Sequence, residues 1–166
     1  MTLYSTTLAT PIGPFTMLAG DDGVHAADFT GCAEDLRPRL DHEHRASGIR
    51  AAADLAEYSR AVAAYFSGDL AAIDGIPVVQ HGTPYLLAAW RALREIPAGT
   101  SITYRELATR LGNAAAARAA GSACGRNTVA LIVPCHRVLR SGGALGGYAS
   151  GLPHKRWLLA HEAQGG

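Results

Sequence analysis

The sequence predicts a mixed α/β (α+β) protein, in which a small N-terminal antiparallel sheet with helices precedes a mainly helical C-terminal domain. Short apolar segments separated by turn residues fill the first thirty positions, whereas helix caps and apolar residues at helical spacing fill the second half. The charge balance changes as well, because residues 1–81 hold 5 Lys and Arg against 11 Asp and Glu, and residues 82–166 hold 10 against 3. We therefore expect one domain over residues 1–81 and a second over residues 82–166.

The composition is that of a globular chain. Of its 166 residues, 48% are hydrophobic and 17% are charged, and this length suffices for one large domain or two small ones that share a core. No apolar run approaches the ~20 residues needed to cross a bilayer, and the N-terminus lacks the charged and then apolar pattern of a secretory signal. We therefore expect a cytoplasmic protein without a membrane partner.

The cysteines and the basic half narrow the range of functions. Cys32, Cys124 and Cys135 are widely spaced and contain no C-x-x-C pair, which argues against a disulfide framework or a zinc knuckle and favours reduced thiols. The excess of cations in the second half indicates a polyanionic partner for that half alone; the alternative is that the asymmetry arose by chance.

Three strands are expected at the N-terminus. Apolar and Thr-rich segments cover Leu3–Thr10, Phe15–Ala19 and Val24–Thr30, and turn residues at 11–14 and 20–23 separate them. This order predicts an antiparallel meander.

The rest of the first half is expected to be less regular. We predict a short helix over residues 32–40, a loop over 41–48 and an amphipathic helix over 51–67 that ends at Gly68. Residues 69–81 resemble a linker, with a short extended piece from Ile76 to Val79.

The second half is expected to contain three helices in close succession. Thr83 is an N-cap before Pro84 and opens a helix that runs to about Glu95. Its core face carries Leu86, Leu87, Trp90 and Leu93.

The next two helices form a helix-turn-helix pattern. Thr103 and Glu106 have the spacing of a capping box, and the helix that they open, with Leu107 and Leu111 facing inward, closes at Gly112. The third helix runs from Ala114 to about Cys124, and Arg118 is its one long side chain. Such a slim helix suits either tight packing against another helix or insertion into a nucleic-acid groove, with Arg118 reaching among the bases.

The segment from Ile132 to Val138 contains the most reactive side chains. Pro134 ends an apolar run, so Cys135 is expected just past a buried segment. His136 and Arg137 follow directly, and such neighbours lower the pKa of a thiol and make it nucleophilic. The alternative is that Cys135 is a small buried hydrophobic residue.

Taken together, these segments resemble the 6-O-alkylguanine-DNA alkyltransferases, also called methylated-DNA–protein-cysteine methyltransferases. The resemblance extends from Gly82 to Glu162, with support from the turn over residues 10–15. It is carried by Arg118–Gly121, Asn127, Ile132–Val138, Gly147–Tyr148 and Trp157–Glu162. It implies a winged helix-turn-helix and the direct repair of 6-O-alkylguanine, and less well of 4-O-alkylthymine, in double-stranded DNA.

In that family the protein rotates the damaged base out of the duplex and moves the alkyl group irreversibly onto its own cysteine, once per molecule. The resemblance implies Cys135 as the nucleophile, His136 as the group that takes its proton, and Glu162 as the carboxylate that orients His136. It further implies that Tyr104 donates a hydrogen bond to the departing base and that Asn127 ties the helix-turn-helix to the active-site turn. We expect a monomer without a cofactor, and cooperative binding along DNA stays open.

The resemblance also implies DNA-contacting and pocket residues. Arg118 would fill the vacancy left by the rotated nucleotide. The expected neighbours on the DNA-contacting surface are Ala117, Ala119, Gly121, Ser122 and Arg126. The expected pocket residues are Tyr148, Val138, Ala149 and Ser150. The candidates for phosphate contact, as a group, are Arg105, Arg126, Arg140, Lys155 and Arg156.

Three positions depart from the family pattern. Thr128 stands where proline is frequent, Ala149 where serine is frequent, and Arg126 where glycine can occur. Some members carry zinc in the N-terminal half. Here the residues considered for such a site form no convincing ligand set, so no metal is expected: Cys32, His25, His42 and His44.

Two other classes compete with alkyl transfer. One is a helix-turn-helix regulator in which Cys135 is structural, although no dimerisation segment is apparent. The other is a cysteine hydrolase, which would turn over an ester or an amide.

Overall fold

The computed structural model describes residues 1–165 and divides the chain into two compact units. One unit contains residues 1–81 together with 128–132, and the other contains residues 82–127 together with those from 133 onward. The short segment 128–132 therefore joins the first unit, although it lies within the range expected for the second domain.

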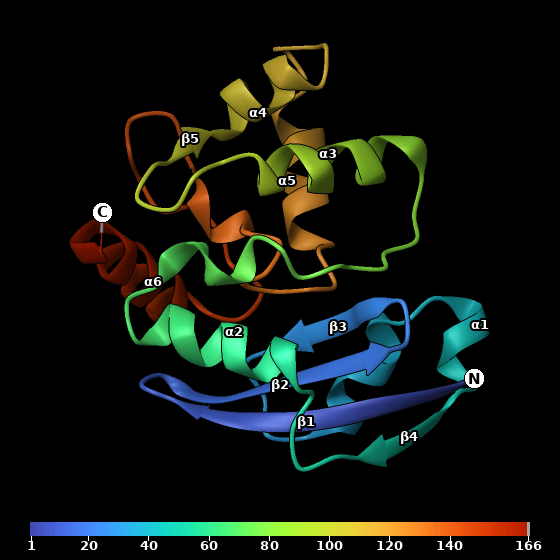
Figure 1. The fold of residues 1–166 in the computed structure, drawn as a ribbon. Coiled ribbons are helices and arrows are strands. Elements are labelled where there is room, and N and C mark those ends of the chain that lie inside the picture. The colour runs from blue at the N-terminus through green and yellow to red at the C-terminus, as the bar shows by residue number, and fades with distance from the viewer. Residues whose placement is uncertain (166) are drawn as a thin grey trace. The chain divides into compact units, whose positions relative to one another are not determined.

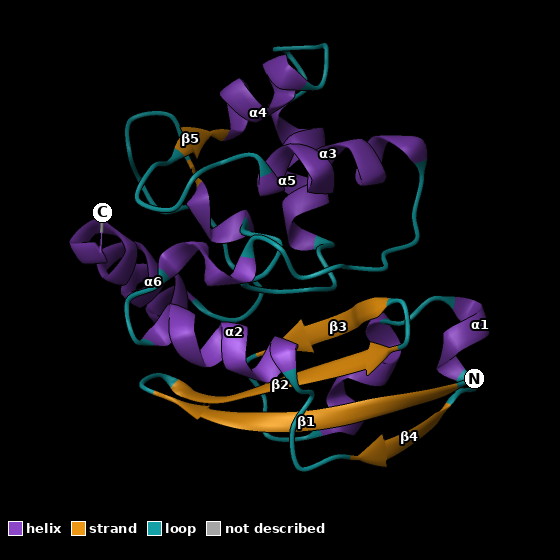
Figure 2. Ribbon diagram, in the orientation of Figure 1, coloured by secondary structure: helices purple, strands orange, loops and turns teal. Residues whose placement is uncertain are grey.

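The first unit is built on a four-stranded sheet in the order β3-β2-β1-β4 (Figures 1 and 2). Strands β1 (Thr2–Thr10), β2 (Gly13–Gly20) and β3 (Gly23–Asp28) form the predicted antiparallel meander. Strand β4 (Gly48–Ala51) pairs in parallel with β1. The sequence analysis missed β4 because its four residues are mostly exposed and show no apolar alternation.

The helices of the first unit are short. They are η1 (Ala33–Arg39), α1 (His42–Arg45), α2 (Glu57–Phe66) and η2 (Leu70–Ile73). The predicted loop over 41–48 therefore contains a helical turn, which Asp41 caps by accepting the backbone N–H groups of Glu43 and His44. The helix expected over 51–67 begins later, because Ala51 ends β4 and the following residues form the connection to α2.

A compact apolar core stabilises this unit. Its buried members are Leu3, Leu18, Ala26, Leu36 and Leu40. The segment 128–132 extends the edge of the sheet, because Ala27 donates its backbone N–H to Thr128 and accepts one from Ala130. This pairing places the apolar run before Pro134 in the first unit, where Val129 is fully buried.

The second unit is mainly helical. Its elements are α3 (Pro84–Arg94), β5 (Ile102–Thr103), α4 (Tyr104–Arg110), α5 (Ala117–Gly125), η3 (Cys135–Arg137), β6 (Val138–Leu139) and α6 (Leu152–Gly165). Strands β5 and β6 pair in parallel, and α4 and α5 form the predicted helix-turn-helix (Figure 1). The mixed α/β class is confirmed.

The predicted caps are confirmed in the second unit. The hydroxyl of Thr83 accepts the N–H of Leu86 with Pro84 in the first turn, and Thr103 and Glu106 form a reciprocal capping box. Such caps each contribute about 1 kcal/mol and fix where the helix begins.

Helix α5 has one tightly packed face and one exposed face. Ala120 and Ala123 are buried, and the carbonyl of Ala123 accepts the indole N–H of Trp90 at 3.0 Å. Arg118 and Ser122 are exposed on the same helix. One face of α5 therefore packs tightly, and the other is available to a partner.

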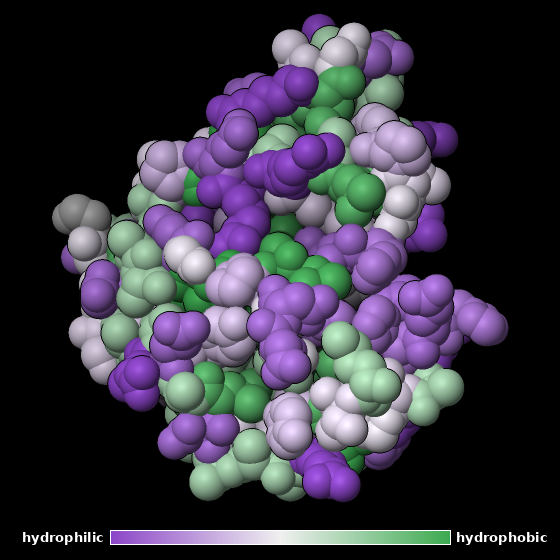
Figure 3. All heavy atoms as spheres, turned by 45° about the vertical axis from the view of Figure 1, so that its right-hand side comes forward, coloured by the Kyte–Doolittle hydropathy of each residue, from purple (hydrophilic) through white to green (hydrophobic). Residues whose placement is uncertain are grey.

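Polar residues make up much of the face drawn in Figure 3, with apolar residues in patches between them. Within residues 1–165, the exposed large hydrophobic side chains are those of Met1, Tyr4 and Leu152. In the same range, none of the helices has the length and apolar character that a bilayer span requires.

Candidate active site

Cys135 is the first residue of η3, directly after Pro134. It is only 8% exposed and is not in a disulfide. The side-chain amide of Asn127 donates to the carbonyl of Val133 at 2.8 Å and to Sγ of Cys135 at 3.4 Å. Asn127 therefore fixes the turn before Cys135 and offers the sulfur a hydrogen bond that favours its charged form.

A buried network of side chains lies next to the thiol. Nε2 of His136 is 2.8 Å from Oε2 of Glu162, and Arg137 donates to both oxygens of the same carboxylate at 2.8 and 2.9 Å. A further nitrogen of Arg137 donates to the carbonyl of Ile96 at 2.7 Å. His136, Arg137 and Glu162 are at most 2% exposed. Such forked pairing suits a buried charge, because the hydrogen bonds compensate for lost water.

The network determines the protonation of His136. Burial raises the pKa of Glu162, but the hydrogen bonds and charges of His136 and Arg137 outweigh burial and hold it well below its ordinary value. Burial lowers the pKa of His136, although Glu162 opposes this shift. Glu162 is therefore anionic and His136 is neutral near pH 7, with its Nε2–H donated to Glu162. Nδ1 of His136 has no hydrogen-bond partner within residues 1–165, so its lone pair can accept a proton.

Lys155 is a further buried cation of this unit. Its ammonium donates to the carbonyl of Val138 at 2.7 Å and to that of Gly147 at 3.1 Å. Lys155 is fully buried, and burial lowers its pKa. The prediction that Lys155 contacts phosphate is wrong, because its side chain is buried and its ammonium is bonded to two backbone carbonyls. It instead ties β6 to the loop around Gly147.

A cavity of about 650 Å³ leads to Cys135. It is lined by Tyr104, Arg105, Ala117, Arg118, Gly121, Cys124, Gly125, Cys135, Arg140, Ser141, Gly146, Gly147, Tyr148 and Ala149. Tyr104 packs closely on Gly146, because a Cβ there would lie 2.9 Å from the tyrosine ring. Burial, with the thiols of Cys124 and Cys135, raises the pKa of Tyr104 to about 12, so its hydroxyl stays protonated and can donate a hydrogen bond.

The structure gathers most of the residues that the sequence analysis selected. Those that line the cavity are Cys135, Tyr104, Ala117, Arg118, Gly121, Tyr148 and Ala149. Asn127, His136 and Glu162 are buried, with Asn127 bonded to Cys135 and Glu162 bonded to His136. Ala119, Ser122 and Arg126 are exposed on α5 or at its end. Val138 is buried and, like the half-buried Ser150, is not among the residues that line the cavity.

Sequence reasoning missed three residues of this site. Arg137 was considered only as a neighbour of the thiol, and its pairing with Glu162 depends on a helix at the far end of the chain. Lys155 was grouped from sequence with the candidate phosphate contacts, whereas its ammonium is buried and donates to backbone carbonyls. Cys124 lines the cavity with a thiol whose pKa is raised by burial and by Cys135, and no sequence signal marked it.

Comparison with known proteins places this geometry in a family. A model described as the 6-O-methylguanine DNA methyltransferase DNA binding domain matches residues 84–164, and a model of that protein's ribonuclease-like domain matches residues 3–80. A methylated-DNA–protein-cysteine methyltransferase of Salmonella typhimurium is 38% identical over 158 residues, which cover 93% of this chain and 92% of that protein. This chain belongs to the 6-O-methylguanine DNA methyltransferase family.

Other members of the family agree with this assignment. A methyltransferase of the same name from Methanosarcina acetivorans is 38% identical over 96% of this chain and 98% of its own. The crystal structure of Mycobacterium tuberculosis O6-methylguanine methyltransferase has a TM-score of 0.81 and 31% identity, and covers 99% of this chain and 94% of that chain. The crystal structure of Mycobacterium tuberculosis OGT in complex with DNA has a TM-score of 0.80 and 31% identity, over 98% and 94%.

One departure from the family pattern has a structural consequence. The side chain of Thr128, at the position where proline is frequent, accepts a hydrogen bond from the amide of Gln80 at 3.0 Å. Its carbonyl accepts the N–H of Ala27. Thr128 thus anchors the segment 128–132 to the first unit by its side chain, which a proline could not do.

Proposed function

We propose that this chain repairs 6-O-alkylguanine in double-stranded DNA by transferring the alkyl group irreversibly to Sγ of Cys135. The observation that carries the proposal is the arrangement around the thiol. Cys135 lies at a cavity with the Asn127 amide on its sulfur, next to a neutral His136 that an ionised Glu162 orients. This is the nucleophile, base and orienting-carboxylate arrangement of a catalytic triad, built on a thiol.

In the proposed reaction, Nδ1 of His136 takes the thiol proton, directly or through one water. The imidazolium that forms is stabilised by Glu162, which Arg137 keeps anionic in the protein interior. The thiolate then attacks the alkyl carbon in line with the carbon–oxygen bond, a carbon–sulfur bond forms, and the electron pair of the broken bond stays on the guanine oxygen. The hydroxyl of Tyr104 donates a hydrogen bond to the base as this charge develops.

The damaged base would occupy the cavity above Cys135. Tyr148 and Ala149 line one part of it, and Tyr104 lies across Gly146. Lys155 holds the backbone at Gly147 and at Val138, so that the wall beside the base is rigid. By the family resemblance, the proposal includes 4-O-alkylthymine as a substrate that reacts less well.

Helix α5 would approach the DNA with its exposed face. Ala117, Gly121 and their small neighbours permit close approach, and Arg118 at the cavity can occupy the space that the rotated nucleotide leaves. Rotation costs a few kcal/mol of stacking and pairing, and less at an alkylated and mispaired base. The proposed phosphate contacts are Arg105, Arg126, Arg140 and Arg156.

A thioether has no route back to a thiol in this site, so each molecule would act once. We propose a cytoplasmic protein that acts as a monomer, with residues 1–81 as structural support and residues 82–166 as the DNA-binding and alkyl-transfer domain.

The test measures the repair of the DNA. A duplex that carries one 6-O-methylguanine within a restriction site is incubated with limiting protein, and restored cleavage is measured. The proposal predicts that repaired DNA reaches a plateau equal to the amount of protein. Continued turnover would indicate a different enzyme, and binding without repair would indicate a regulatory or lesion-sensing protein.

A further inference from the structure

A groove of the second unit shares no residue with the cavity at Cys135. Its volume is about 570 Å³, and it is lined by Tyr85, Ala88, Arg91, Ala92, Glu95, Arg110, Leu111 and Gly112. We propose that this groove binds a phosphate group of the DNA backbone, so that the chain contacts the duplex at a place beyond α5 and the cavity. The inference rests on the proposed function, because it adds a contact to the same DNA complex.

Two helices form the groove. The residues from α3 and its C-cap are spaced three or four apart, which places them on one face of the helix. The other wall is the last turn of α4 and the residues that end it. Ala88 and Ala92 reach no further than a methyl group, so the space between the two helices stays open.

The groove carries a net positive charge. Arg91 comes from α3 and Arg110 from α4, and both are exposed, whereas Glu95 is the single acidic residue of the lining. Nε of Arg91 donates to the carbonyl of Leu87 at 3.4 Å, which directs the stem along its own helix and leaves the two terminal nitrogens for a ligand. Guanidinium groups suit phosphate, because their N–H groups can donate two parallel hydrogen bonds to its oxygens.

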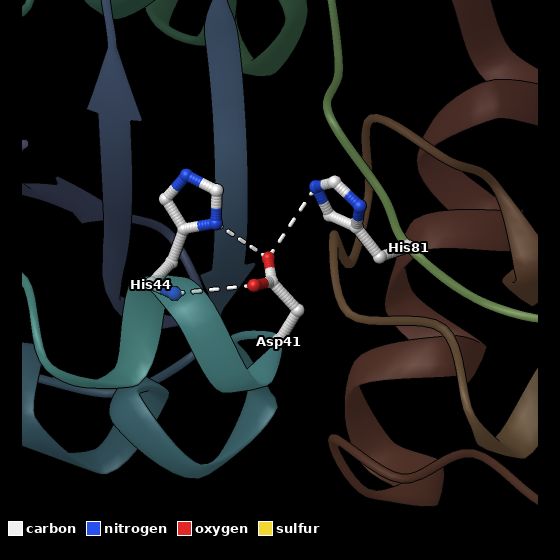
Figure 4. A group of neighbouring side chains, drawn as sticks. All are labelled: Asp41, His44 and His81. Carbon is white, nitrogen blue, oxygen red and sulfur yellow. Dashed lines mark hydrogen bonds and ion pairs between the residues drawn. The ribbon is translucent and has the colours of Figure 1, made fainter.

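The two arginines lack a partner within the chain. In the first unit, the basic side chains His44 and His81 both lie against the carboxylate of Asp41, at 2.6 and 3.3 Å (Figure 4). Arg91 and Arg110, by contrast, are in no ion pair within residues 1–165. Their charge is therefore left for an anion from outside the chain.

Tyr85 gives a second, independent indication of a ligand. Its hydroxyl is buried and has no hydrogen-bond partner within residues 1–165. A buried hydroxyl without a partner is unfavourable, because it has lost its water and gained nothing in return. A phosphate oxygen that enters the groove beside Tyr85 would supply the missing acceptor.

The groove is placed to meet the same DNA as the cavity. Helix α4 is the first helix of the helix-turn-helix, and in such motifs this helix crosses the DNA backbone. Tyr104 at its start lines the cavity, and Arg110 at its end lines the groove. The seven residues of α4 rise by about 9 Å, which equals two to three base pairs at about 3.4 Å each.

A free phosphate ion presents the same oxygens as the DNA backbone. The DNA backbone is the favoured source, because the groove lies in the half of the chain that holds 10 Lys and Arg against 3 Asp and Glu. A groove with two cations and one acid would hold a free ion only weakly. A phosphate of a duplex that α5 already binds is delivered to the groove without a further loss of translational freedom.

The test is the salt dependence of binding to an undamaged duplex. The variant with both Arg91→Ala and Arg110→Ala should bind at least about tenfold more weakly at low salt. The slope of log K against log salt concentration should become shallower by about 1, as expected for one lost phosphate contact. Arg60→Ala is the matched control, because Arg60 is exposed on α2 in the first unit, and it should keep both the affinity and the slope.

Two further variants separate a phosphate contact from a structural role. Arg110→Lys keeps the charge and should keep the slope. Glu95→Gln removes the acidic residue of the groove and should strengthen DNA binding, the opposite sign to the arginine variants. Equal weakening in Glu95→Gln and Arg110→Ala would overturn the proposal, because it would indicate damage to the α3 and α4 pair.

The outcomes distinguish this inference from the proposed function. An unchanged slope in the double arginine variant, with a wild type that binds and repairs DNA, would overturn the groove contact alone. Loss of repair and of DNA binding in the wild type would overturn the proposed function and this inference with it. Saturable binding of inorganic phosphate that the double variant loses, with no change in its DNA slope, would assign the groove to a free anion and overturn the DNA contact.

Discussion

Arg137 donates two hydrogen bonds to Glu162, one to each oxygen, and thereby holds an ionised carboxylate against His136 in the protein interior. Cys135 and His136 are adjacent in the sequence. Arg137 and Glu162, which set the charge of His136, lie 25 residues apart in the chain.

Arg137→Ala should destabilise the second unit strongly. The substitution leaves the charge of Glu162 buried without its cation, which costs about 3–5 kcal/mol. The free energy of unfolding, from urea titration, measures the effect. Arg156→Ala on exposed α6 surface is the control and should stay within about 0.5 kcal/mol of the wild type. A loss below about 1 kcal/mol for Arg137→Ala would contradict a buried and unscreened network.

The stability of the protein should fall as pH falls below 6.5. The pKa of His136 is lowered from its ordinary 6.5 by burial, so the unfolded chain binds a proton there before the folded one does. The stabilisation is therefore complete above pH 6.5 and is lost below it, and Glu162 adds a further loss below its ordinary pKa of 4.5. Urea midpoints measured from pH 8 to pH 4 test the sign. A midpoint that rises on acidification would show that His136 is protonated in the fold.

Arg118→Ala should weaken repair of duplex DNA far more than reaction with the isolated 6-O-methylguanine base. The side chain is exposed at the cavity, and it is proposed to hold the duplex open without taking part in the chemistry. Second-order rate constants with both substrates give the comparison, with Arg60→Ala on exposed α2 surface as the control. Equal losses with both substrates would remove Arg118 from the base-rotation step.

Gly146→Ala should slow alkyl transfer, and Gly147→Ala should not destabilise the protein. A Cβ at Gly146 would lie 2.9 Å from the ring of Tyr104, on backbone with φ of 70°, whereas a Cβ at Gly147 meets nothing within 4 Å. We expect Gly146→Ala to lower the free energy of unfolding by about 1–3 kcal/mol and to displace the Tyr104 hydroxyl. Melting temperatures and rate constants of the pair measure both effects. If Gly146→Ala and Gly147→Ala had the same melting temperature and rate constant, the close packing of Tyr104 on Gly146 would not be required for stability or alkyl transfer.

The features that sequence predicted well are those with a local cause. Thr83 with Pro84, and Thr103 with Glu106, are caps that depend on three or four neighbouring residues, and both helices begin where expected. Strand β4 and helix α1 were missed because each is too short to show a period. Their formation depends on pairing with β1 and on a single cap at Asp41.

The features that sequence did not predict depend on distant partners. From sequence alone, Lys155 could not be distinguished from the surface cations. Its burial depends on the carbonyls of Val138 and Gly147, which accept hydrogen bonds from its ammonium. His81 was placed in a linker, and its approach to Asp41 arises from the path of that segment beside α1 in the first unit.

The central claim is that Cys135 accepts the alkyl group, and mass spectrometry tests it most directly. Protein is mixed with an excess of duplex that contains one 6-O-methylguanine, and the intact protein and its peptides are then weighed. The account predicts one added methyl per molecule, located on Cys135, and none on Cys124 or Cys32. A methyl on another residue, or an unchanged mass with the lesion removed from the DNA, would contradict it.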